Sequence, residues 1–262
     1  MSVRYDDVAR EHVKRLRSAD TAVEADKIMQ AALNRLGYGN YIYGWGVGNL
    51  KKRISREVSF RTTLSISFME RYLKTSQPFV DQDFYAWQCD RQTEVILWGD
   101  PAIHAIMNPM ERACDGWLAE SAGLCVGHTL PLAGFAGAGV GGIGICAHSS
   151  ITQEKINDHW RNVGWGVNML VRAYHEELHG RLLRAEVGLT PQEKTVLEHQ
   201  LSGYGPKEIA QIIGRSEKAV YGYLRAATEK LGARTDGQAL IRAYSIRAIS
   251  DRSDAQNRGM SR

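Results

Sequence analysis

The sequence lacks the features that assign many chains to a class at first sight. No apolar run approaches the roughly 18 residues needed to cross a bilayer, and the N-terminal stretch "MSVRYDDVAREHVKRLRSAD" has no apolar signal region. The four cysteines form no C-x-x-C pair and have no metal-ligand spacing, which argues against a zinc site or a disulfide scaffold. We therefore expect a cytoplasmic protein without a membrane partner or a bound metal, with reduced and mostly buried thiols.

Charge is nearly balanced over the whole chain but is unevenly placed. The 262 residues carry 33 Lys and Arg against 29 Asp and Glu, a net charge of +4. From Leu189 to the C-terminus, 12 basic residues stand against 8 acidic ones, which also gives +4, so residues 1–188 balance to zero with 21 of each sign. A neutral large part and a basic small part indicate that only the C-terminal part meets a polyanion, although +4 also suits an ordinary solvated surface.

Helical and strand-like patterns alternate through the first 188 residues. Helices are predicted at residues 5–37, 65–76, 108–123 and, as one long helix, from Thr152 to 186. Strands are predicted at residues 41–47, 56–60 and 93–99, and a hairpin with a glycine-rich turn at 126–147. This order predicts an α+β fold, an α-β-α sandwich in which helices cover an antiparallel sheet.

The C-terminal part predicts four short helices with recognisable ends. Thr190, Pro191 and Glu193 have the spacing of a capping box with proline at the first helical position. Ser216 is a suitable N-cap and Gly232 a suitable helix end. The predicted helices cover residues 191–202, 206–213, 217–231 and 236–248, and must pack as a bundle because each is marginal alone. We divide the chain into a ligand-binding and dimerisation domain (1–175), a linker (176–188) and an all-α DNA-binding domain (189–262).

The predicted helix at 217–231 has one apolar face and one basic face. Its apolar residues recur at helical spacing and are expected in the bundle core: Val220, Leu224, Ala227 and Leu231. A basic face after a tight helix–turn is typical of a recognition helix in the major groove of double-stranded DNA, with Arg225 suited to guanine and Tyr221 offering a hydroxyl. Lys207, Ser216 and Lys218 lie near helix starts and suit phosphates. The alternative is a solvated face in a helical interaction module.

The C-terminal motifs resemble the DNA-binding domain of the LuxR-type regulators. The stretches "LTPQEKTVLEHQLSG", "KEIAQIIGRSEKAV" and "EKLGARTDGQALIRA" carry the resemblance. The matching positions are Leu189, Thr190, Glu193, Gly203, Glu208, Ile209, Ala210, Ser216, Val220, Lys230 and Leu231. Gln192 stands where the family usually has arginine, and Tyr223 where histidine is common. The resemblance implies a tetrahelical domain that binds promoter DNA. The two departures, Gln192 and Tyr223, leave open which DNA sequence this domain prefers.

A second resemblance links the first domain to the acyl-homoserine-lactone-binding domain of the quorum-sensing members. It rests on "FMERYLKTSQPFVDQDFY", "GLCVGHTLPL" and the position of a tryptophan between them. It implies these ligand-binding residues: Leu64, Phe68, Tyr72, Asp83, Trp98 and Thr129. In such a site Asp83 accepts from a ligand amide and Tyr72 donates to a carbonyl, inside apolar walls. Taken singly, an aspartate in "DQD" is usually a surface residue and a tryptophan usually part of a core.

Three residues of the first domain depart from that family pattern. Phe68 stands where an indole N–H usually holds the lactone carbonyl, Phe84 where a proline is usual, and Gly144 where a hydroxyl residue is common. The departures leave open a different signal, a weak response or no ligand. The alternative function is a ligand-independent regulator, or an anti-activator that acts by forming heterodimers.

One motif suggests a different class of protein. The run "GAGVGG" at residues 137–142 matches G-x-G-x-x-G, but a dinucleotide-binding loop must open a helix, and "IGICAHSS" after it is strand-like. A hairpin turn fits better, and a nucleotide-dependent enzyme is the least favoured alternative. The sequence thus predicts a homodimeric transcription regulator, not an enzyme and without a cofactor, whose partners are promoter DNA and a small diffusible signal.

Overall fold

The structure is a computed structural model that describes residues 5–46, 58–73, 82–89, 91, 94–132, 140–148 and 151–250. The chain divides into two compact units, residues 1–177 and 178–262. The first combines helices with an antiparallel sheet and the second is helical, so the predicted fold class is confirmed. Among the described helices, none is both long and apolar enough to cross a membrane.

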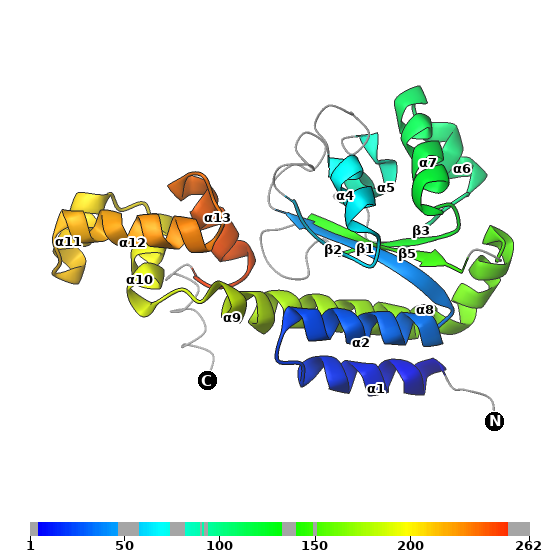
Figure 1. The fold of residues 1–262 in the computed structure, drawn as a ribbon, viewed down its shortest axis with the longest axis horizontal. Coiled ribbons are helices and arrows are strands. Elements are labelled where there is room, and N and C mark those ends of the chain that lie inside the picture. The colour runs from blue at the N-terminus through cyan, green and yellow to red at the C-terminus, as the bar shows by residue number, and fades with distance from the viewer. Residues whose placement is uncertain are drawn as a thin grey trace. The chain divides into compact units, whose positions relative to one another are not determined.

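A five-stranded antiparallel sheet forms the middle of the first unit (Figure 1). Its order is β2-β1-β5-β4-β3, with β1 (Tyr38–Gly46), β2 (Val58–Thr62), β3 (Ile96–Leu97), β4 (Gly127–Pro131) and β5 (Val140–Ala147). The predicted hairpin consists of β4 and β5, with Thr129 opposite Gly144. Its turn, residues 133–139, lies outside the described residues. Each strand overlaps a run whose pattern predicts one.

Helices cover both faces of this sheet (Figure 1). One side has α1 (Tyr5–Arg17), α2 (Ala22–Arg35) and α8 (Gln153–Glu177), and the other has α4 (Ile66–Leu73), α5 (Phe84–Gln88), α6 (Pro101–Ile106) and α7 (Pro109–Ala122). The helix predicted over residues 5–37 is two helices, because Thr21 accepts a hydrogen bond from the Glu24 N–H and starts α2. The sequence pattern does not predict α5 and α6, which are too short to show a helical period.

Side chains of β1 alternate between two different surroundings. Tyr43 and Trp45 face α8, where the Tyr43 hydroxyl is hydrogen-bonded to His175 Nδ1 at 2.7 Å and the Trp45 ring lies 4.4 Å from the His175 ring. Ile42 and Gly44 face the opposite side and line a cavity. The two-residue period of one strand therefore separates a side packed with buried rings from a side that leaves space.

The predicted long helix extends past α8. Five residues of π-helix, Leu178–Leu182, follow it, and then α9 (Leu183–Val187), which ends at Gly188 with a φ of 59°. A π-helical turn replaces i→i+4 hydrogen bonds by i→i+5 bonds and occurs frequently at functional sites. The prediction of one continuous helical stretch from Thr152 to residue 186 is confirmed apart from this local change of helix type.

The second unit contains the four predicted helices, α10 (Pro191–Leu201), α11 (Pro206–Ile213), α12 (Glu217–Lys230) and α13 (Asp236–Ser245). Thr190 and Glu193 form the predicted capping box, and Ser216 caps α12 by accepting from the Ala219 N–H. The residues expected in the bundle core are all buried: Val220, Leu224, Ala227 and Leu231.

An ion pair joins α10 to the end of α12. The Glu193 side chain is 6% exposed and accepts two hydrogen bonds from Lys230 Nζ, at 3.0 and 2.9 Å. Burial raises the pKa of the Glu193 carboxyl, but the hydrogen bonds from Lys230 and from the Thr190 backbone outweigh burial and hold the pKa below its usual value. Lys230 also donates to the Gly188 carbonyl at 3.2 Å. Glu193 and Lys230, two positions of the C-terminal motif, therefore hold the end of α12 against the start of α10.

Candidate ligand cavity and DNA-binding helix

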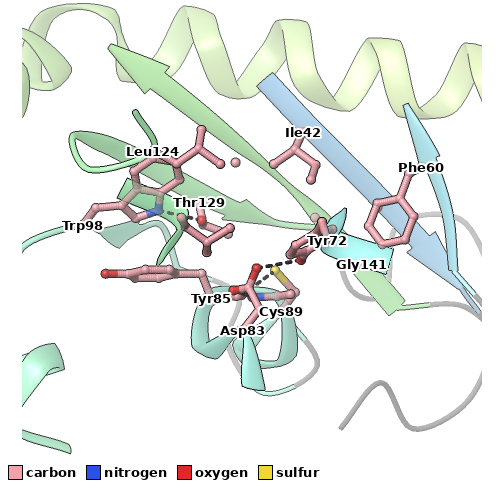
Figure 2. A pocket seen from close by; sticks show the side chains of 15 residues that line it. Ile42, Phe60, Tyr72, Asp83, Tyr85, Cys89, Trp98, Leu124, Thr129 and Gly141 are labelled. Carbon is pink, nitrogen blue, oxygen red and sulfur yellow. Dashed lines mark hydrogen bonds between the residues drawn. The ribbon is translucent and has the colours of Figure 1, made fainter. Parts of the chain in front are cut away.

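A cavity lies in the first unit between the sheet and helices α4, α5 and α7 (Figure 2). Its volume is about 70 Å³ as traced by the centre of a water-sized sphere. One water needs roughly 10–15 Å³ by this measure, so the cavity has room for about five. Of the 15 described residues that line it, Asp83 alone is charged. The cavity therefore suits a small and largely apolar molecule.

Tyr72 and Asp83 form the polar centre of this cavity (Figure 2). Tyr72 lies in the last turn of α4, and Asp83 is the N-cap of α5. The Tyr72 hydroxyl donates to Asp83 Oδ2 at 2.7 Å, and the Ala86 N–H donates to Asp83 Oδ1 at 3.0 Å. A carboxylate offers about four acceptor positions, so these two bonds leave it able to accept from a ligand N–H as well.

The surroundings of the Asp83 carboxyl oppose its negative charge. Asp83 is 9% exposed, and burial raises its pKa, although the hydrogen bonds from Tyr72 and Ala86 act in the opposite direction. Asp115 on α7 adds a repulsion that also raises the pKa of Asp83. No described residue that lines the cavity is Lys, Arg or His. A ligand with an N–H donor is therefore favoured at Asp83, whereas a ligand carboxylate is repelled.

Trp98 and Thr129 form a second polar pair in the cavity wall. The Trp98 indole N–H donates to Thr129 Oγ1 at 2.8 Å. The Thr129 oxygen accepts in this bond, so its own hydroxyl proton can be donated to a ligand carbonyl. Gly144 is the cross-strand partner of Thr129, and a Cβ at Gly144 would stand 3.2 Å from Trp98 Cζ2. The absence of a side chain at Gly144 thus lets the indole pack closely on β5.

Four of the six residues proposed for ligand binding line the cavity: Tyr72, Asp83, Trp98 and Thr129. Phe68 is buried, but its ring stacks on the rings of Tyr72 and Trp117, with centroids 5.9 and 5.4 Å apart, and does not line the cavity. Leu64 is half-buried against the same aromatic core and does not line the cavity either. The structure thus brings four of these residues together and leaves two outside the wall.

Several other residues line the cavity without having been predicted, among them Ile42, Tyr85, Cys89, Leu118 and Leu124. The alternation in "YIYGWG" separates Ile42 and Gly44 from the neighbouring aromatic residues and is a usable signal. Aspartate is a favoured N-cap residue, but the five residues of α5 after Asp83 are too few to show a helical period, so this residue type alone does not predict the helix. No local pattern marks Leu118 or Leu124, because tertiary packing alone brings them to the cavity.

The glycine-rich run at residues 137–142 does not open a helix. Its described end, residues 140–142, begins β5, which continues as a strand to Ala147. A Cβ at Gly142 would lie 2.5 Å from Cys89 Sγ, closer than packed side chains come. Sheet packing therefore explains this glycine, and a dinucleotide-binding loop, which needs a helix directly after the glycines, does not.

In the second unit, the residues proposed to contact DNA are all exposed. Lys207 lies in the first turn of α11, Ser216 is the N-cap of α12, and Lys218, Tyr221 and Arg225 follow along α12. The same helix buries its apolar residues in the bundle, as a recognition helix in a helix-turn-helix does. The basic face is thus presented to solvent on a rigid element.

Arg225 has an intrahelical partner. Its Nε donates to Glu229 Oε1 at 3.0 Å, and the two side chains are 84% and 66% exposed. Exposed pairs of this kind contribute little to stability. The pair therefore leaves the Arg225 guanidinium accessible to a stronger partner from solvent.

Replacing Gly222 in α12 should stabilise the second unit. No atom lies within 4 Å of the position that a Cβ would take in Gly222→Ala, and alanine favours a helix interior over glycine by about 0.5–1 kcal/mol. Denaturant unfolding should show an increase of that size in the free energy of unfolding. Gly214→Ala is the matched control: its φ is 64°, so alanine is strained there and stability should fall. A loss of stability in Gly222→Ala would contradict the helical assignment of Gly222, and a gain in Gly214→Ala would contradict the positive φ at Gly214.

Comparisons with known proteins extend this description. Residues 187–243 match the model of a family described as bacterial regulatory proteins, luxR family. No curated protein matches the chain. The solved structure of SdiA in complex with octanoyl-rac-glycerol is similar over 94% of this chain and 97% of that one, with a TM-score of 0.56 and 18% identity. Escherichia coli SdiA is similar over 91% and 96%, with a TM-score of 0.53 and 20% identity. At these identities the likeness shows a shared fold.

Proposed function

We propose that this chain, whose C-terminal unit belongs to the luxR family of bacterial regulatory proteins, controls transcription in response to a small diffusible signal bound in the cavity of its first unit. The family consists of DNA-binding regulators rather than enzymes, in agreement with the prediction from the sequence. The observation that carries the proposal is the convergence of two polar pairs, Tyr72 with Asp83 and Trp98 with Thr129, on one apolar cavity.

An acyl-homoserine lactone is the first candidate for the signal. Its amide N–H suits the Asp83 acceptor, a carbonyl suits the Thr129 hydroxyl, and its acyl chain suits the apolar walls. The small volume of the cavity favours short acyl chains. An uncharged acyl compound without an amide is the second candidate, because the similar SdiA structure is a complex with octanoyl-rac-glycerol.

The second unit is proposed to read promoter DNA as part of a homodimer. Arg225 and Tyr221 on α12 would reach base edges, while Lys207, Ser216 and Lys218 would hold phosphates. A two-fold dimer presents two recognition helices to half-sites about one helical turn apart. Ligand control then requires that the signal bind the DNA-competent state and the incompetent state with different affinities.

Thermal unfolding of the purified protein tests the sensing proposal. The panel contains acyl-homoserine lactones of increasing chain length and octanoyl glycerol. A ligand at about a hundred times its dissociation constant adds roughly 2.7 kcal/mol of stability, so we expect a clear upward shift with a short-chain member. The ring-opened acyl-homoserine, a carboxylate, is the matched control and should give no shift because Asp83 repels it. If no compound shifts the transition of folded protein, the ligand-independent regulator replaces this proposal.

An anti-activator that acts by forming heterodimers makes a different prediction. Its homodimer would not bind DNA even at low salt, where phosphate contacts are strongest. The exposed face with Lys218 and Arg225 supports the DNA-binding homodimer instead. A gel-shift experiment at low salt separates the two.

A further inference from the structure

Two cysteines beside the cavity direct their thiols at the same carbonyl oxygen. The Cys125 thiol donates to the Gly123 carbonyl at 3.6 Å, and the Cys146 thiol donates to it at 3.3 Å. The two sulfurs are therefore no farther apart than the sum of these distances. Cys125 is exposed, whereas Cys146 is buried near the C-terminal end of β5, two residues after Gly144, which lines the cavity. We propose that Cys125 and Cys146 form a reversible disulfide and that this bond reshapes the cavity.

The strand register explains why the bond would move a cavity wall. Cys146 pairs with Gly127, and the Ala147 N–H donates to the Val126 carbonyl at 2.9 Å, so Cys125, in the turn two residues before β4, lies close to the diagonal position from Cys146. Diagonal Cα atoms are about 7–8 Å apart in a regular sheet, and a disulfide needs about 4.4–6.8 Å. The bond therefore forms when the connection between α7 and β4 moves toward β5. Leu124, which lines the cavity, lies in that connection.

The environments of the two thiols assign them different chemical roles. The exposed Cys125 thiolate attacks hydrogen peroxide, takes one oxygen as a sulfenic acid and releases one water after protonation. The Cys146 thiol then attacks the sulfenic sulfur and loses its proton, and a second water leaves as the disulfide forms. Burial, and after it the nearby Cys125, raise the pKa of Cys146 to about 11, which suits the resolving thiol rather than the one that meets peroxide.

This site goes beyond the proposed function, because it responds to oxidants whatever the cavity binds. Cytoplasmic disulfides are mostly transient and redox-sensing. Oxidation would therefore act on the same cavity as the signal, through Leu124, and make the response of the regulator depend on peroxide as well as on ligand.

Mass spectrometry of the full chain after peroxide treatment tests the bond. The expected result is the loss of two of the four thiols, a mass lower by two hydrogens, and a non-reduced peptide pair joining Cys125 to Cys146 that dithiothreitol separates. Cys125→Ser is the control, at an exposed position, and should form no such pair while unfolding like the parent. A sulfenic acid trapped at Cys125 without a link to Cys146, or a link between Cys125 of two copies, would overturn the proposal.

The effect on the cavity is measured without any ligand. Cys89 lines the cavity, so the rate at which iodoacetamide alkylates it reports on the cavity wall. We expect a several-fold change of this rate between the oxidised and the reduced protein, and no change in Cys125→Ser. An unchanged rate in protein that carries the mapped disulfide would refute the link to the cavity, and it would do so whether or not the acyl ligand is correct.

Discussion

Arg225→Ala should reduce specific DNA binding toward the non-specific level while the protein stays folded. The Arg225 side chain is 84% exposed, and its ion-pair partner among the described residues is Glu229 on the same helix. Its guanidinium can bind guanine through two parallel hydrogen bonds, and such a contact contributes about 1–3 kcal/mol, or roughly 5- to 150-fold in affinity. Fluorescence anisotropy at a fixed salt concentration, with a duplex selected from random sequences by the parent protein, measures this loss.

Two further variants separate base reading from general electrostatics. Arg161→Ala removes a similarly exposed arginine (79%) from α8, where it pairs with Asp158 at 2.9 Å, and should leave specific affinity unchanged. Lys218→Ala should weaken binding to all sequences and reduce the salt dependence by about one phosphate contact. If Arg225→Ala binds the selected duplex as tightly as the parent, the basic face of α12 is not the recognition face.

The second unit could be predicted almost entirely because its signals are local. The capping box at Thr190 and the N-cap at Ser216 determine where α10 and α12 begin, and the structure places both as expected. Helix ends are less well marked. The last helix was expected to reach residue 248 and ends at Ser245, where Arg247 adopts a positive φ of 52°. No glycine marks this end, so the sequence pattern extends past it.

The cavity could be predicted only in part because its wall is assembled from distant segments. The resemblance to the quorum-sensing regulators identifies Tyr72 and Asp83. Their hydrogen bond depends on the position of Asp83 as the N-cap of α5, and the five residues of this helix show no helical period. Phe68 is one turn from Tyr72 and was expected in the same wall. Its ring instead stacks on Trp117 of α7, a tertiary contact that no local pattern encodes.

Asp83→Asn should stabilise the protein without ligand at neutral pH. Burial raises the pKa of Asp83 above its ordinary value of 3.8. The stability that the protonated Asp83 side chain contributes is therefore fully present below pH 3.8 and is lost as the pH rises through the pKa of the folded state. Above that pKa the folded protein holds a charge that its surroundings oppose, and asparagine removes it while remaining a good N-cap for α5. The unfolding midpoint of Asp83→Asn should exceed that of the parent at pH 7, and the gain should vanish below pH 3.8.

The same substitution should weaken the response to a ligand that donates an N–H. Hydrogen bonds to charged groups contribute about 1.5–3 kcal/mol, so we expect roughly a tenfold or greater loss of affinity, measured by titration calorimetry. Asp100→Asn is the matched control. Asp100 caps α6, accepts from the Ala102 N–H at 2.8 Å and does not line the cavity, so its substitution should leave affinity unchanged.

The two effects of Asp83→Asn have opposite signs, and this separates a binding role from a structural one. If the carboxylate served only as the acceptor for the Tyr72 hydroxyl, Asp83→Asn would lower the stability, because a charge-assisted hydrogen bond is weakened, and would leave ligand affinity unchanged. If the folded protein instead keeps the carboxylate at an unfavourable position because it binds the ligand, Asp83→Asn raises the stability and lowers the ligand affinity. This is the usual trade-off between stability and function at a functional site. Lower stability with an unchanged response would therefore assign Asp83 to the fold of α5 and remove it from the sensing site.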